Sequence, residues 1–194
     1  MTRMHPVSSM AGRVLTFTML LLLLLAQSAV TASAQELLQP RLQIGINLLP
    51  AIIAANRSVI SSDPGSELSI YLAYRADRHL AEQLQSRLAQ RGAIQQHPLH
   101  ISAVRLDDLF AQSLPRNSTI FVVEPLDDRL QELIEYAAQQ RALLFSPHQG
   151  DVERGVNAGL KVTDKVLPMV NMASLKNSKI QLKAFFLRIA VKHE

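Results

Sequence analysis

The chain of 194 residues contains no cysteine and no tryptophan, and aromatic residues make up only 5% of it. Without cysteine the folded chain has no disulfide and no thiol for redox sensing, so its stability must come from packing. A lipid anchor attached through cysteine is excluded for the same reason.

A long hydrophobic run is lacking everywhere except near the start of the chain. Arg3 and Arg13 precede an apolar core over residues 14–26, and residues 32–34 (Ala-Ser-Ala) match the cleavage pattern of a secretory signal peptide. The apolar core of about 13 residues is shorter than the roughly 20 that a membrane-spanning helix needs. We therefore expect residues 1–34 to be a signal peptide cleaved after Ala34, with no membrane span in the mature chain.

The mature chain also lacks a strong charge. Cleavage would remove two of the 20 basic residues and none of the 16 acidic ones, which leaves a net charge of +2 over 160 residues. That length fits one domain with a core of its own. A weak charge without clustered Lys and Arg gives no footprint for nucleic acid.

Strands and helices alternate along the mature chain. Four short apolar runs predict strands over 68–74, 100–104, 118–123 and 142–145. Helices are expected from Asp77, Leu106 and Asp127, with the aspartates as N-caps. An earlier helix over 40–56 should be kinked or start late, because Gly45 and Pro50 disfavour an undisturbed helix.

The C-terminal third predicts a hairpin followed by helices. Residues 159–163 should pair with 166–170 across a two-residue turn at 164–165, and Asn171 should open a helix. A last helix would bury Leu182, Phe186 and Ile189 on one face, which leaves Phe185 as an interface candidate. Together these elements predict a single α/β domain of three layers. Its sheet is mostly parallel, with helices on both faces and a C-terminal antiparallel hairpin at one edge.

Ligands of open α/β sheets bind outside the carboxyl ends of the strands. The most polar segment there is the loop over 146–154, which contains Ser146, His148, Asp151, Glu153 and Arg154. Ser146, His148 and Asp151 could be read as a nucleophilic triad, but they stand too close in sequence and lack a Gly-x-Ser-x-Gly elbow.

The same loop can also be considered as a metal site, as a phosphate or cofactor site and as a contact for an anionic partner. His148, Asp151 and Glu153 could offer metal ligands, but without a paired metal-binding spacing we predict no metal. Gly150, Gly155 and Gly159 match no phosphate-binding or dinucleotide-binding pattern, so no cofactor is predicted either. Arg154 could meet an anionic partner or be an ordinary surface charge.

The second half of the chain resembles the YfiR-like family of exported bacterial proteins. The likeness lies in the strand Thr119–Val123, the later strand Ala142–Ser146 and a glycine-bearing loop over 150–159. A strand that ends in Asn171 follows, and then a segment over 173–190 that resembles the family's closing helices. The chain lacks the Trp-Pro pair and the cysteines of many relatives.

The resemblance implies a non-catalytic periplasmic protein that binds the periplasmic domain of an inner-membrane signalling protein. The partner would be a diguanylate cyclase, which acts in cyclic-di-GMP signalling, or a sensor kinase. The residues expected to bind a partner or ligand are His148, Asp151, Glu153, Arg154, Asn171 and Phe185. A homodimer is left open, and the alternatives are a periplasmic small-molecule binding module and, less favoured, an exported hydrolase.

Overall fold

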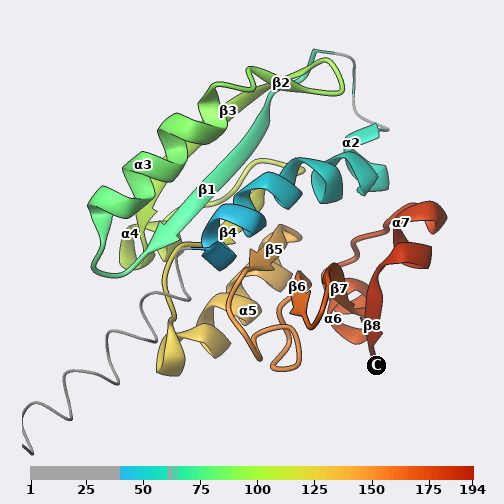
Figure 1. Cartoon of the computed structure of the whole chain (residues 1–194). Helices are drawn as coiled ribbons and strands as arrows, with labels where there is room; N and C mark the ends of the chain where they lie inside the picture. The colour runs from blue at the N-terminus through green and yellow to red at the C-terminus, as the bar shows by residue number, and fades with distance from the viewer. Residues whose placement is uncertain (1–39, 61–62, 64) are drawn as a thin grey trace, which may run out of the picture. The chain divides into compact units, whose positions relative to one another are not determined.

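The computed structural model describes residues 40–60, 63 and 65–194 (Figure 1). Residues 41–194 form one compact unit. The predicted signal peptide and its cleavage site lie outside the described residues. No helix in the described part is long and apolar enough to cross a bilayer.

The unit is built on one sheet of eight strands in the order β2-β3-β1-β4-β5-β6-β7-β8. The central strands β3, β1, β4, β5 and β6 are parallel, and β7 runs antiparallel to β6. The predicted α/β class with a mostly parallel sheet and a C-terminal hairpin is therefore confirmed. The strands are β1 (Leu68–Tyr74), β2 (Ala93–Ile94), β3 (His97–Arg105), β4 (Thr119–Val122), β5 (Leu143–Ser146), β6 (Ala158–Val162), β7 (Val166–Asn171) and β8 (Val191–His193).

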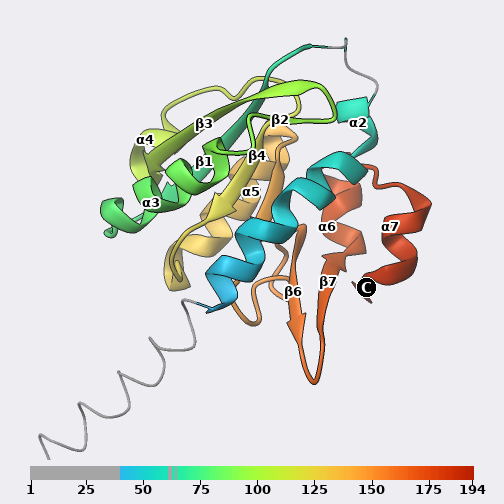
Figure 2. The same ribbon diagram turned by 45° about the horizontal axis from the view of Figure 1, so that its top comes forward.

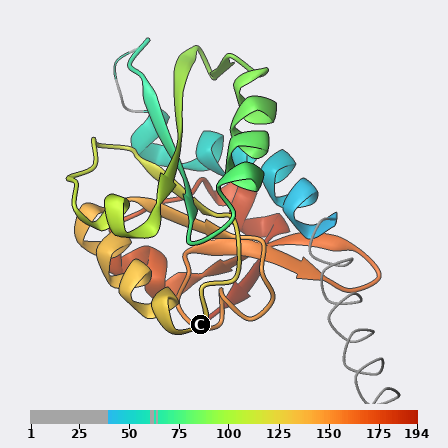
Figure 3. The same ribbon diagram turned by 90° about the vertical axis from the view of Figure 1, so that its left-hand side faces the viewer.

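Helices cover both faces of the sheet (Figures 2 and 3). On one face, α4 and α5 bury an apolar cluster with side chains of β1, β4 and β5, among them Tyr71, Ile120 and Leu144. The opposite face is covered by α3 and by a helix over residues 40–55, here called the N-terminal helix. The remaining bounds are α2 (Arg57–Ile60), α3 (Arg78–Ala89), α4 (Leu106–Phe110), the 3-10 helix η1 (Asp127–Arg129), α5 (Leu130–Gln140), α6 (Met172–Asn177) and α7 (Ala184–Ile189).

The N-terminal helix is already formed at Pro40 and continues through Gly45 and Pro50, so the expected late start was wrong. A Cβ on Gly45 would lie 2.9 Å from Pro147 Cβ and 3.3 Å from Phe145 Cε1. Phe145 in turn stacks on Phe121, with ring centroids 5.6 Å apart. Gly45 is therefore the point where the helix backbone approaches the sheet, and packing outweighs the poor helix propensity of glycine.

The two predicted N-caps have different outcomes. Asp77 caps α3 as expected, since its Oδ1 accepts a hydrogen bond of 2.9 Å from the backbone N–H of Leu80. Asp127 does not cap α5; it lies inside η1 with a φ of 43°, and α5 begins at Leu130. The intervening 3-10 turn occupies the residues that were expected to open the α-helix.

The hairpin of β6 and β7 forms with a register one residue away from the prediction. Val162 pairs with Val166, so the loop has three residues rather than two. The loop is closed by Thr163, whose N–H donates to Lys165 O at 2.9 Å. A slip of one residue exchanges the two faces of a strand, so this difference decides which side chains meet the core.

Both edges of the sheet differ from the prediction. The short β8 pairs parallel with β7, so the hairpin is not the outermost element on its side. At the other edge, β2 pairs with an early start of β3 through a turn at Gln95 and Gln96, both with positive φ. Strands of two and three residues are too short to leave a periodic pattern in the sequence.

Candidate functional site

The carboxyl ends of β1, β4 and β5 meet at one edge, as their parallel order requires. Glu124, just after β4, accepts hydrogen bonds from the backbone N–H groups of Ala76 (2.6 Å) and Asp77 (3.2 Å), and from that of Arg75. These N–H groups form a small anion-binding nest at the end of β1. The carboxylate of Glu124 fills the nest and ties the loop after β1 to the end of β4.

Ser146, His148 and Asp151 do not form a catalytic triad. The Ser146 hydroxyl donates a buried hydrogen bond of 2.6 Å to Asp151 Oδ2 and accepts one of 3.1 Å from the backbone N–H of His148. The ring nitrogens of His148 are buried and make no hydrogen bond. A working triad needs the imidazole to take the proton of the hydroxyl, and here the hydroxyl is bound to a carboxylate.

Asp151 is held by its surroundings as a structural group. Its residue is 6% exposed, and burial raises the pKa of the carboxyl, while the bond from Ser146 and the charge of Arg154 oppose that rise. Arg154 Nη1 lies 3.8 Å from Asp151 Oδ1, and Nη2 donates to the carbonyl of Asp127 at 2.6 Å. Arg154 thus links the loop to η1 with its guanidinium half-exposed.

His148 lies beneath the N-terminal helix with 6% of its surface exposed. The pKa of its imidazole is lowered to about 4, first by burial and then by the nearby charge of Arg41. The Val122 backbone and the charges of Glu124 and Asp127 raise the pKa, but by less than burial and Arg41 lower it. His148 is therefore neutral at pH 7.

Asn171 belongs to a buried hydrogen-bond network with Asn157. Sequence reasoning identified Asn171 but missed Asn157. Asn171 caps α6 by accepting from the Ser174 N–H (2.8 Å), as predicted, and also donates to Val152 O (2.8 Å). Asn157 accepts from the Leu144 N–H (2.8 Å) and donates to Ser174 Oγ (2.7 Å) and Ser178 Oγ (3.1 Å). The only signal for Asn157 was an amide placed directly before a strand, which is a common feature of loops.

The predicted site residues are thus divided between internal structure and surface. The structure brings His148, Asp151, Arg154 and Asn171 to one loop region, but the buried ones are fixed by packing or internal hydrogen bonds. Glu153 is exposed in the same loop. Within the described residues, no three His, Cys, Asp or Glu side chains are grouped closely enough to hold a metal ion.

Phe185 lies apart from that loop on α7, and 49% of its surface is exposed, as expected for an interface candidate. Leu182 and Phe186 are buried, as predicted. Ile189 was also expected to be buried, but it is 59% exposed, so that prediction was wrong. The short α7 turns only one of its large apolar side chains inward. Phe185 and Ile189, spaced by four residues, form an exposed apolar pair.

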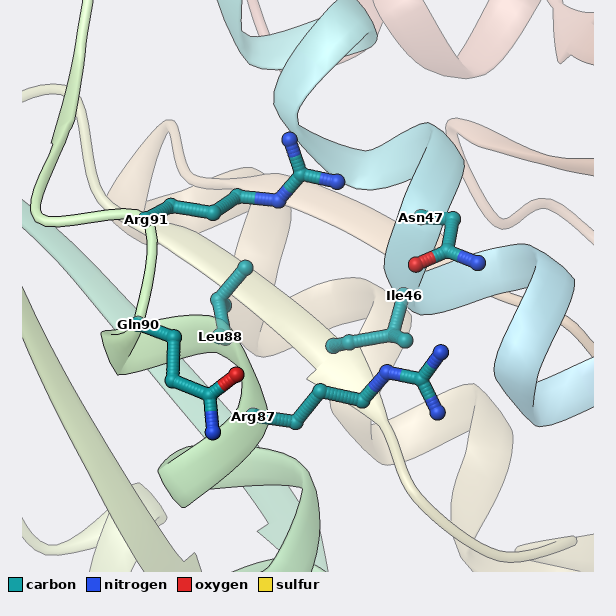
Figure 4. Close-up of a pocket in the computed structure, with 6 residues that line it drawn as sticks. All are labelled: Ile46, Asn47, Arg87, Leu88, Gln90 and Arg91. Atoms are coloured by element: carbon teal, nitrogen blue, oxygen red, sulfur yellow. The ribbon is translucent and has the colours of Figure 1, made fainter.

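Two cavities involve other residues. One of about 220 Å³ lies between the N-terminal helix and the end of α3, lined by Ile46, Asn47, Arg87, Leu88, Gln90 and Arg91 (Figure 4). A wider cleft of about 900 Å³ is lined by residues that include Arg116, Asn117, Arg141 and Lys179. The residues predicted to bind a partner or ligand line neither of them.

Comparisons with known proteins leave the family open. No family model matches the chain, and no curated protein matches it. Among solved structures, it is similar to the ABC domain in complex with L-Trp from Streptococcus pneumonia, with 10% identity and a TM-score of 0.49. The likeness covers 78% of this chain and 59% of that one, so the chain spans less than two thirds of that protein's length.

Proposed function

We propose that this chain is an exported, non-catalytic regulator that binds the periplasmic domain of an inner-membrane signalling protein. The partner is a diguanylate cyclase or a sensor kinase, as the resemblance to the YfiR-like family implies. The observation that carries the proposal is the exposed apolar pair on α7, Phe185 and Ile189. Exposed aromatic side chains are enriched among the residues that dominate protein interfaces.

The arrangement of the carboxyl edge supports a binding role over a catalytic one. Ser146 and Asp151 are bound to each other, and Glu124 occupies its own nest of N–H groups. A regulator would act by binding one state of the partner's periplasmic domain more tightly than the other. A difference in affinity between the two states is what changes the cytoplasmic output.

A small-molecule binding module is the alternative function. The observation that favours it is the presence of two cavities whose linings include basic side chains. The loop over 146–154, where that function was first expected, contributes to neither lining. An exported hydrolase has less support, because the serine and histidine of the loop are not paired.

Cross-linking of the tagged protein in cells, followed by affinity capture and mass spectrometry, tests the proposed function. We expect a membrane-anchored cyclase or kinase in the captured material. Phe185→Asp should reduce that capture by about tenfold or more, because it places a charge in an apolar contact. Recovery of the chain alone would contradict the proposal and shift support to a homodimer or a small-molecule binding module.

A matched control separates the α7 surface from general surface hydrophobicity. Leu167, on β7, is also a large exposed apolar residue, at 37%. Leu167→Asp makes the same change of chemistry away from α7 and should leave capture unchanged. If both variants fold and both still capture the partner, α7 is not the contact surface.

A further inference from the structure

The small cavity between the N-terminal helix and α3 has the composition of an anion site. Its floor is apolar, since Ile46 and Leu88 are 2% and 1% exposed. Figure 4 shows Arg87, from the end of α3, and Arg91, from the turn after it, extending across the cavity towards the N-terminal helix, which carries Asn47. The lining thus combines two guanidinium groups and an amide with an apolar base.

Neither arginine has a partner that would explain its position. In the described part of the chain, no carboxylate lies within ion-pair distance of Arg87 or Arg91, whereas Arg78 on the same helix pairs with Glu82 at 2.7 Å. Arg87 stands in the last turn of α3 and Arg91 in the turn that follows the helix, and both line the same cavity. An anion bound in the cavity would supply a counter-charge to both side chains.

A helix C-terminus favours basic side chains, which offers a purely structural explanation. The hydrogen bonds at this helix end argue against direct capping by the arginines. The Leu88 carbonyl accepts from the backbone N–H of Arg91, and the Ala89 carbonyl accepts from that of Gly92, both at 3.1 Å. The last turn is closed by backbone groups, so both guanidinium groups remain available to a ligand.

We propose that this cavity binds a small dianion, either a short dicarboxylate or a phosphomonoester. Arginine presents its N–H groups in a planar fork that matches the two oxygens of a carboxylate or phosphate. The volume of about 220 Å³ is below the roughly 300–1,000 Å³ of sites for drug-sized ligands, so the ligand carries only a few carbons. Ile46 and Leu88 would contact those carbons. The site lies apart from α7 and does not depend on the proposed partner.

Isothermal titration calorimetry of the purified protein tests the site with two probes, succinate for a dicarboxylate and inorganic phosphate for a phosphate group. We expect at least one probe to bind, and the tighter one identifies the ligand class. The double variant Arg87→Gln/Arg91→Gln should weaken that binding by about tenfold or more, because hydrogen bonds to charged groups are lost.

The matched control is Arg116→Gln/Arg141→Gln, which removes the same charge from the wider cleft. It should leave the affinity within about twofold, a difference too small for a lost contact. Equal weakening in both double variants would show a non-specific charge effect and overturn the proposal. Loss in the control alone, or no binding of either probe to the native protein, would overturn it as well. All four arginines are exposed, so circular dichroism spectra of the variants should match the native spectrum.

Discussion

The side chain of His148 has both ring nitrogens enclosed and without a hydrogen bond. Its pKa is about 4 in the folded protein, compared with the ordinary value of 6.5. Between these values the unfolded chain binds a proton that the folded chain does not, so the free energy of unfolding must fall as the pH falls. This loss of stability is complete below about pH 4 and absent well above pH 6.5.

We predict that acidification from about pH 7 to about pH 4 costs the native protein up to about 3 kcal/mol through His148. Urea unfolding at several pH values across that range measures the free energy of unfolding. Asp151, whose pKa is raised, acts in the opposite sense, since it favours the folded state as the pH falls. The variant His148→Gln, which cannot be protonated, isolates the histidine contribution. Parallel pH profiles for the variant and the native protein would contradict the prediction.

At the residue scale, sequence reasoning identified polar residues but not their partners. It placed Ser146, His148 and Asp151 in one loop, and they are in one loop. The hydrogen bond from the Ser146 hydroxyl to the Asp151 carboxylate depends on the turns of the loop, and no residue pattern specifies those turns. The effect of Arg41 on His148 joins positions more than 100 residues apart, as does its bond of 3.1 Å to Pro147 O.

At the scale of elements, the N-terminal helix depends on one close contact. Gly45→Val would place a branched side chain where a Cβ alone comes within 2.9 Å of Pro147. The helix would have to move away from Phe121 and Phe145, and we predict a loss of about 1–3 kcal/mol. Thermal or urea unfolding checks this. Ala51→Val, at an exposed position of the same helix, should cost less than about 1 kcal/mol, and equal losses in the two variants would contradict the assigned contact.

The elements that were predicted well have strong local signals. Strand β1 is a short apolar run, helix α3 has leucines at every fourth residue, and the cap at Asp77 fixes where α3 begins. The hairpin was correct in kind and wrong in register, because a two-residue and a three-residue turn fit the same apolar pattern. Gly45 was read as a helix breaker because sequence shows propensity, whereas the contact with Pro147 exists only after folding.

For the molecule as a whole, the order of strands could be anticipated only in outline. Alternating strands and helices indicate a parallel sheet with covered faces, and that is what forms. The short strands that complete the two edges, β2 and β8, were not seen. Edges matter because a free edge can pair with another chain, and a homodimer would be one way to cover β8.

Amide hydrogen exchange can establish whether the β8 edge is free in solution. Strands β4 and β5 are fully buried and have neighbours on both sides. Strand β8 has two partly exposed residues and one exposed residue, and it pairs only with β7 in the described part of the chain. We predict that amides of β4 and β5 exchange more slowly than those of β8 by about a hundredfold or more, because edge strands open locally at low cost.

The same experiment at two protein concentrations, about tenfold apart, separates an isolated edge from a dimer. A free edge predicts fast exchange of β8 at both concentrations, because local opening involves only one molecule. Protection of Val191–His193 that rises with concentration would contradict this and show that a second copy covers the edge. Unchanged protection in β4 and β5 across both samples is the internal control.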